Sequence, residues 1–283
     1  MTASERLSKL IKFPGWGDPE NAIWFVGIEE AGEWTCCEFY KSRCKELKNI
    51  STKEYYEKFY ERDVENSIIK DYTPGIDDNI YFGKFDEREK CNPTYLGISK
   101  FYCNIFESNS DARSYLFNEL CKPSKTTNSF LSNLNPLGVK NINEVRWNQV
   151  LEDYTKIFGI TNKSKTEYEK EMISKRKIVL SEFYDRIKKK PKVVIAFGYS
   201  NGKDKMHEQL LRTLLKNDSI VFEKTEWLKV NASSSLIIKQ FNEFLYILLP
   251  HFRVDRTKCY KSIKDGVDYI NLYDLIRKRL ISK

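Results

Sequence analysis

The chain has 283 residues, of which 41% are hydrophobic and 14% are aromatic. This composition supplies enough apolar side chains for a substantial core, so it excludes an intrinsically disordered protein. Lysine and arginine outnumber the acidic residues by 48 to 40, which gives a net charge of +8. A moderate positive excess suits contact with a polyanion such as nucleic acid, although solubility alone would explain it equally well.

Short apolar runs recur along the chain, and each is followed by Gly, Pro or Asn. Continuous apolar runs of this length are typical of strands that are buried on both faces of a mainly parallel sheet. The runs cover residues 22–28, 130–134, 193–197 and 244–249. Residues 220–230 alternate between apolar and polar side chains, which predicts an edge strand or a hairpin.

Amphipathic helical patterns lie between and after these runs. They predict helices over residues 168–190, ended by Pro191, over residues 203–216, and over residues 267–280. Strands that alternate with helices predict an α/β fold, a three-layer α/β/α sandwich with a mainly parallel central sheet.

The sequence indicates that two segments are insertions into this sandwich. Residues 33–92 are tyrosine-rich and highly charged, with a helix expected over residues 52–69, and residues 253–265 form a shorter basic stretch. Because linkers rich in Pro or Gly are absent, we expect a single domain over residues 1–283 with a helical insertion at about 33–92.

The cysteines and histidines do not form a recognisable metal motif. None of the seven cysteines has the Cys-x-x-Cys spacing of a zinc or iron–sulfur site, and His207 and His251 are the two histidines. We therefore expect reduced, mostly buried thiols, no metal and no cofactor.

Targeting signals are not apparent in the sequence. Residues 1–12 mix charged residues with Leu and Ile, without the apolar stretch of a signal peptide. The most hydrophobic segment, residues 241–250, is too short to span a bilayer. We expect a cytoplasmic monomer that does not contact membranes.

The candidate functional residues follow the predicted strands. In open α/β sheets, ligands bind at the carboxyl ends of the strands, so these residues are expected to gather along one edge. They are Gly27, Ile28, Glu29 and Glu30 after the first run, Asn133 and Asn135 at the second, Gly198 to Lys203 after the third, and His251 after the fourth. Each has a structural interpretation as well, as a helix-start acid, a turn former or a turn glycine, so the functional case depends on their joint placement.

The glycines do not form a nucleotide-binding motif. The segment Gly198-Tyr-Ser-Asn-Gly202-Lys203 is one residue shorter than a phosphate-binding loop, and Asp204 stands where that loop needs Ser or Thr. Gly-x-Gly-x-x-Gly does not occur, whereas residues 198–202, Gly-Tyr-Ser-Asn-Gly, match the Gly-x-Ser-x-Gly pattern of the nucleophile elbow.

The order of these motifs resembles the uracil-DNA glycosylase superfamily. Four segments correspond to strands and loops of the family: the first loop at residues 27–30, the second strand with its asparagine at 130–136, the third strand at 192–198, and the last strand with its histidine at 248–251. Residues 95–101 are similar to the family segment that supplies a base-stacking aromatic residue. The similarity extends over residues 22–252 with one large insertion. This chain departs from the family in having Glu29 for Asp or Asn, Glu30 for Pro, and Phe252-Arg253 for Pro-Ser after the histidine.

The resemblance implies a monofunctional DNA glycosylase, which hydrolyses the N-glycosidic bond of a damaged or modified pyrimidine and leaves an abasic site without a cofactor. Glu29, with Glu30 as helper or alternative, would stabilise the oxocarbenium-like transition state and activate water. His251 would donate to the departing base, and Asn133 would bind its pairing edge. Tyr95 or Phe101 would stack on the flipped base. Gly27, Ile28 and Asn135 would complete the base pocket, and the DNA contacts would come from Gly198, Lys203, Arg253, Arg256 and Lys258.

The unusual Glu29-Glu30 pair and the segment 33–92 suggest a target other than plain uracil. We hypothesise a hypermodified cytosine of bacteriophage DNA, because the sequence resembles glycosylases of this superfamily that act in antiviral defence. The sequence leaves two alternatives open: a non-catalytic nucleic-acid-binding module of the same fold, and a hydrolase of nucleosides or nucleotides.

Overall fold

A computed structural model describes the parts of the chain from which the fold is built. These are residues 11, 16–17, 20–29, 93–108, 129–135, 147–148, 151, 155, 159–160, 164–198, 204–231, 234–250, 254–265 and 267–282. The proposed insertion at 33–92 and its expected helix at 52–69 lie outside the described residues.

The described strands form one large sheet and one small hairpin. The large sheet has seven strands in the order β1-β3-β2-β4-β7-β6-β5. Their bounds are Trp16–Gly17 for β1, Ile23–Glu29 for β2, Phe130–Asn135 for β3, Val193–Phe197 for β4, Trp227–Asn231 for β5, Ser234–Gln240 for β6 and Leu245–Leu249 for β7. The strands β3, β2, β4 and β7 are mutually parallel and form the centre, while β1, β6 and β5 are antiparallel to their neighbours.

The α/β class and the parallel centre of the sheet confirm the sequence prediction. The four apolar runs correspond to β2, β3, β4 and β7. Every residue of β4 and β7 is buried, as expected for strands covered on both faces. In the alternating segment 220–230 the strand β5 begins only at Trp227, after the short 3₁₀ helix Lys224–Glu226, and β5 lies at the edge of the sheet.

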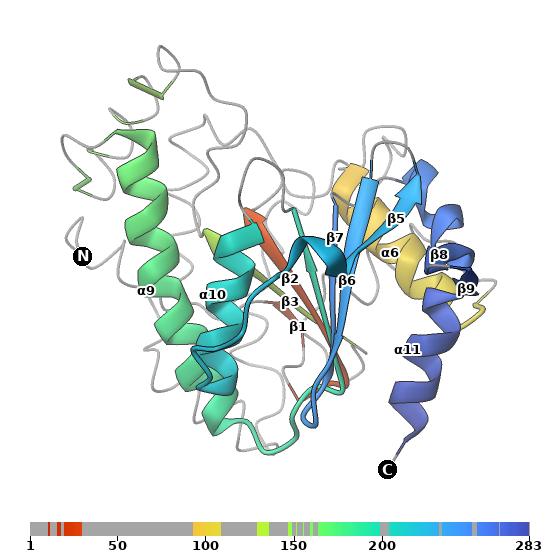
Figure 1. Ribbon diagram of the computed structural model, residues 1–283. Coiled ribbons are helices and arrows are strands. Elements are labelled where there is room, and N and C mark those ends of the chain that lie inside the picture. The colour runs from red at the N-terminus through yellow and green to blue at the C-terminus, as the bar shows by residue number, and fades with distance from the viewer. Residues whose placement is uncertain are drawn as a thin grey trace, which may run out of the picture.

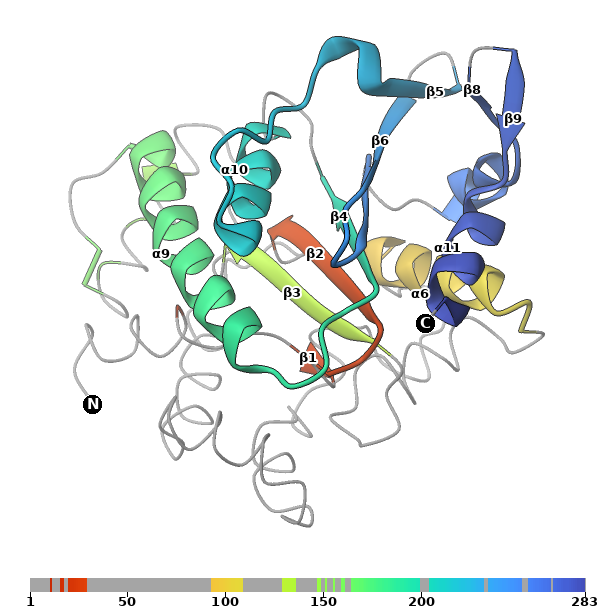
Figure 2. The ribbon, with the colours of Figure 1, turned by 60° about the horizontal axis from the view of Figure 1, so that its bottom comes forward.

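Helices lie on both sides of the large sheet. The helices α9 (Lys165–Arg186) and α10 (Asp204–Leu215) pack together on one side, and α6 (Pro93–Ile105) and α11 (Leu272–Ile281) lie on the other (Figure 1, Figure 2). A 3₁₀ helix, η5 (Val254–Lys261), precedes the small hairpin of β8 (Ile263–Asp265) and β9 (Asp268–Ile270). Among these described helices, none is both long enough and apolar enough to cross a membrane.

Local hydrogen bonds set the helix boundaries. Ser164 caps α9 in a reciprocal box with Glu167, a common device at helix starts. The predicted last helix begins later than residue 267, because residues 268–270 pair as β9 and Asn271 then caps α11. The Asn271 side chain accepts hydrogen bonds from the backbone N–H groups of Tyr273 and Asp274.

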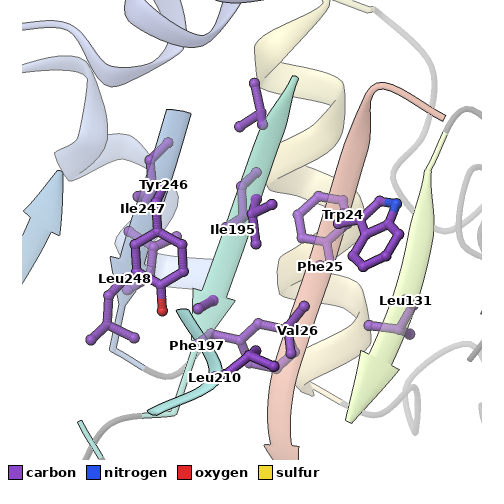
Figure 3. Close-up of a cluster of buried hydrophobic side chains, with 14 of the residues drawn as sticks. Trp24, Phe25, Val26, Leu131, Ile195, Phe197, Leu210, Tyr246, Ile247 and Leu248 are labelled. Atoms are coloured by element: carbon purple, nitrogen blue, oxygen red, sulfur yellow. The ribbon is translucent and has the colours of Figure 1, made fainter. Parts of the chain in front are cut away.

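Aromatic side chains connect the sheet to its helices. Trp24 of β2 contacts Phe130 of β3 at a ring-centroid distance of 4.9 Å, and Phe183 of α9 at 6.2 Å. Figure 3 shows Trp24 among the buried side chains of the parallel strands, with Ile195 on β4 and Tyr246 on β7. Full burial of aromatic side chains contributes about 1.5–3 kcal/mol each, so this core fixes the relative positions of the four central strands.

Candidate functional site

The carboxyl ends of the four parallel strands lie at one edge of the sheet. Gly27 of β2 pairs with Asn133 of β3 on one side and with Phe197 of β4 on the other. Phe197 in turn pairs with Leu249, the last residue of β7. Since neighbouring strands lie about 4.8 Å apart, β2 and β7 are separated by about 10 Å, with β4 between them.

This edge brings together the backbone positions of several predicted site residues. Glu29 is the last residue of β2 and pairs with Asn135, the last residue of β3. Gly27 is buried and pairs with Asn133, and Ile28 lies between Gly27 and Glu29 in the same strand. The placement of the first and second predicted motifs next to one another therefore follows from the register of two parallel strands.

Other predicted residues lie outside the described part of the chain: Glu30, Lys203, His251 and Arg253. The described backbone leads up to His251, because β7 ends at Leu249 and the buried Pro250 follows. In the sequence, His251 comes two residues after the carboxyl end of a strand that belongs to the site edge.

Gly198 ties the end of β4 to the end of β7. Its φ of 90° lies in the region that favours glycine, and its N–H group donates a 3.2 Å hydrogen bond to the carbonyl oxygen of Leu249. Because Gly198 is buried and its N–H group is already bonded, the structure favours the interpretation as a turn glycine over the predicted DNA contact.

His207 ties the same strand end to helix α10, and sequence reasoning gave it no role. Its Nε2 atom lies 3.0 Å from the carbonyl oxygen of Phe197, and the side chain is fully buried. Because a carbonyl oxygen only accepts, Nε2 carries the proton and Nδ1 is the bare nitrogen. Burial lowers the pKa of His207 to about 3, against a weaker opposing effect of the Phe197 hydrogen bond, so the imidazole is neutral at pH 7.

Arg176 of α9 supports the strand that carries the two asparagines. It is 3% exposed and donates from Nη1 to the carbonyl oxygen of Ile11 at 2.8 Å and from Nη2 to the Ser132 hydroxyl at 3.3 Å. Ser132 immediately precedes Asn133 in β3. A buried guanidinium that binds two separate segments fixes their relative position through its rigid geometry.

Phe101 is a core residue and does not line an open site. It is fully buried in α6, and its ring contacts those of Tyr260 at 5.5 Å and Tyr273 at 5.1 Å. An aromatic ring enclosed by two others has no free face for a nucleobase, so the stacking role predicted for Phe101 is wrong for this conformation. Tyr95, the other candidate, belongs to the same helix α6.

The remaining basic candidates lie on η5. Lys258 is exposed, and Arg256 belongs to the same 3₁₀ helix. The helix η5 starts at Val254, so these residues follow His251 closely in the chain. Their position is compatible with contact to a ligand that approaches the carboxyl end of β7.

The described part of the chain contains no cluster of three or more His, Cys, Asp or Glu residues that could hold a metal ion. Comparisons of the chain with protein-family models, with curated proteins and with solved structures found no match. The case for a function therefore depends on the residues at the edge of the sheet.

Proposed function

We propose that this chain is a monofunctional DNA glycosylase with a three-layer α/β/α sandwich of the uracil-DNA glycosylase type. The observation that carries the proposal is the register of the parallel strands. It pairs Glu29 with Asn135 and Gly27 with Asn133, next to the end of β4, and β7 leads into His251 one strand further along.

In this proposal a carboxylate acts on the sugar side of the N-glycosidic bond, and an imidazole acts on the base side. As the bond between the base and C1′ breaks, positive charge develops on the sugar and negative charge on the base. Glu29 would stabilise the sugar cation and take a proton from the attacking water, and Glu30 is its helper or alternative. The water oxygen then bonds to C1′, and the base leaves with the electron pair of the broken bond.

His251 would stabilise the departing base by donating a hydrogen bond to its carbonyl oxygen, and a preorganised donor of this kind contributes about 3 kcal/mol to a transition state. Asn133 carries one donor and one acceptor group, which suits the pairing edge of a pyrimidine. The contacts of His207 and Gly198 with the end of β4 would keep this edge rigid, as a preorganised site requires.

The proposed substrate is DNA that contains a modified pyrimidine, with the hypermodified cytosines of bacteriophage DNA as the leading target and antiviral defence as the biological role. The motivation is the sequence Glu29-Glu30, which replaces the usual residues of the family's first loop. A second carboxylate adds an acceptor that plain uracil does not need and that hydroxymethyl or sugar substituents would satisfy.

The proposal is tested by incubating the full chain with duplexes that contain ordinary bases, uracil or bacteriophage-type modified cytosines. Released base is identified by mass spectrometry, and abasic sites are detected by strand breakage in alkali. We expect base release from the modified duplex. Release from uracil DNA alone would contradict the proposed target, and release from no duplex would contradict the glycosylase assignment.

The same samples distinguish the two alternatives. A binding module would retain salt-dependent affinity for the duplexes without releasing base. A nucleoside hydrolase would release base from free nucleosides, which a glycosylase acting on polymer would leave intact.

A further inference from the structure

The hairpin of β8 and β9 presents two faces of different character. The register pairs Ile263 with Ile270, Lys264 with Tyr269, and Asp265 with Asp268. Side chains alternate between the faces of a strand, and Ile263 is fully buried, so its face is the inner one. Lys264 and Tyr269 therefore form a cross-strand pair on the outer face, opposite to the face of Asp265 and Asp268.

The outer face is aromatic, exposed and basic. The Tyr269 side chain is 69% exposed, which is unusual for an aromatic residue of this size. Lys264 is exposed, and so are Lys258 and Lys261 of the adjoining η5. Within the described residues, none of these three lysines forms an ion pair. We call the cross-strand pair Lys264 and Tyr269 the hairpin platform; Lys258 and Lys261 precede it in the chain.

The hairpin platform is connected to the proposed site by a short piece of chain. The strand β7 ends at the site edge with Leu249, and η5 begins at Val254. The strand β8 packs against β5, and both ribbon views show the hairpin beside the end of that strand (Figure 1, Figure 2). In the chain, η5 lies between the carboxyl end of β7 and the hairpin.

We propose that the hairpin platform binds single-stranded DNA, with an unpaired base stacked on Tyr269 and the neighbouring phosphate bound by Lys264. Exposed aromatic rings flanked by cations are the means by which proteins hold unpaired nucleotides without reading their sequence. A tyrosine loses little conformational freedom when a base covers its ring, because it has only two side-chain torsions. The choice of DNA as the polymer rests on the proposed function. The stacking surface is inferred independently, from the exposure of Tyr269 and its pairing with Lys264.

The test compares the affinity of purified full-length variants for fluorescein-labelled oligothymidylate, measured by fluorescence anisotropy over a series of salt concentrations. Tyr269→Ala is expected to weaken binding about 5- to 140-fold, since alanine substitution at a stacking residue removes about 1–3 kcal/mol per base. Tyr269→Phe keeps the ring and should bind as the wild type does. Lys264→Ala should weaken binding at low salt and reduce the slope of log affinity against log salt by about 0.7.

Two matched controls lie at the opposite edge of the sheet. Ile281→Ala removes an apolar side chain that is 82% exposed, at the end of α11 where Lys192 donates to the carbonyl oxygens of Leu280 and Ser282. Lys189→Ala removes an exposed lysine just before β4. Both variants should bind oligothymidylate as the wild type does.

Several results would overturn the proposal: no binding by the wild type, wild-type affinity in Tyr269→Ala, or equal losses in Tyr269→Ala and Ile281→Ala. Heparin, a polyanion without bases, separates stacking from charge. Tyr269→Ala should leave heparin binding unchanged, and an equal loss for both polymers would refute stacking. A further outcome is that the wild type releases no base from the duplexes while Tyr269→Ala still binds oligothymidylate more weakly than the wild type does. In that case the glycosylase proposal fails and the stacking proposal stands. Base release combined with wild-type affinity in Tyr269→Ala would refute stacking and leave the glycosylase proposal intact.

Discussion

The imidazole of His207 donates a hydrogen bond to the carbonyl oxygen of Phe197, and the whole contact is buried. It joins the first turns of α10 to the last residue of β4, and Phe197 is also the register partner of Gly27 and Leu249. One side chain therefore connects a helix to the strand end that lies in the middle of the candidate site. Substitutions at this edge and in the residues that support it can separate effects on stability from effects on the proposed activity.

The pH dependence of stability should report the burial of His207. Its folded-state pKa of about 3 lies below the ordinary value of 6.5, so the unfolded chain binds more protons between these values. The contribution of His207 to stability is therefore fully present above about pH 6.5 and falls as the pH is lowered, by up to about 1.4 kcal/mol per pH unit.

Urea unfolding of the wild type and His207→Gln at pH 7, 6 and 5 measures this effect. Glutamine can still donate to Phe197 but does not titrate, so the advantage of the wild type over the variant should shrink as the pH falls. The difference between the two proteins isolates His207 from the carboxylates, which titrate in both. A difference that stays constant from pH 7 to pH 5 would contradict the assignment of a buried neutral imidazole.

Arg176→Ala should destabilise the protein by about 1–3 kcal/mol, because it leaves the buried carbonyl oxygen of Ile11 without this donor and removes packing from the α9 face of β3. Ser132→Ala removes the 3.3 Å contact with Arg176 Nη2 and should cost about 1 kcal/mol. Chemical unfolding of both single variants and the double variant gives their coupling, which is expected to be at least about 0.5 kcal/mol. Strictly additive effects would show that the guanidinium does not support β3 through Ser132.

Gly198→Ala should lower the free energy of unfolding by about 1–2 kcal/mol, since a Cβ atom is disfavoured at its φ of 90°. The backbone hydrogen bond to Leu249 needs no side chain and can persist, so the protein should remain folded. If the turn after β4 belongs to the site, the rate of base release should fall more than the folded fraction does. Unchanged unfolding energy would mean that the turn adapts to alanine without strain.

The sequence predicted those parts of the fold that depend on continuous burial. The strands β4 and β7 are recognisable because their residues are almost all apolar, as strands covered on both faces must be, and β2 and β3 begin with apolar residues. The sequence does not predict the strand β6, since Ser234, Ser235 and Lys239 interrupt its apolar pattern. The β8–β9 hairpin was assigned in part to a helix, because its stabilising pairs form across strands and leave no local periodicity.

The site was predictable as a location and less so as a set of contacts. Parallel strands end at a common edge, so the placement of Glu29 and Asn135 at that edge could be inferred from the apolar runs that precede them. His207 and Arg176 are surrounded in sequence by charged residues, and only the packing of α9 and α10 on the sheet buries them. For Phe101 the sequence allowed both a stacking and a core role, and the contacts with Tyr260 and Tyr273 decide for the core.

The most direct examination of the proposed chemistry uses Glu29→Gln and His251→Ala in single-turnover base release from the modified duplex. Loss of the carboxylate should slow the reaction by about 10²- to 10⁴-fold, the usual effect of a general base, and loss of the imidazole donor by about 10²- to 10³-fold. Glu243→Gln is the matched control, because Glu243 is an exposed carboxylate between β6 and β7 at the opposite edge of the sheet. Circular dichroism of all three variants checks that they are folded. Wild-type rates in both Glu29→Gln and His251→Ala would remove these residues from the mechanism, whereas a loss in Glu243→Gln as large as theirs would show that the assay reports stability and not catalysis.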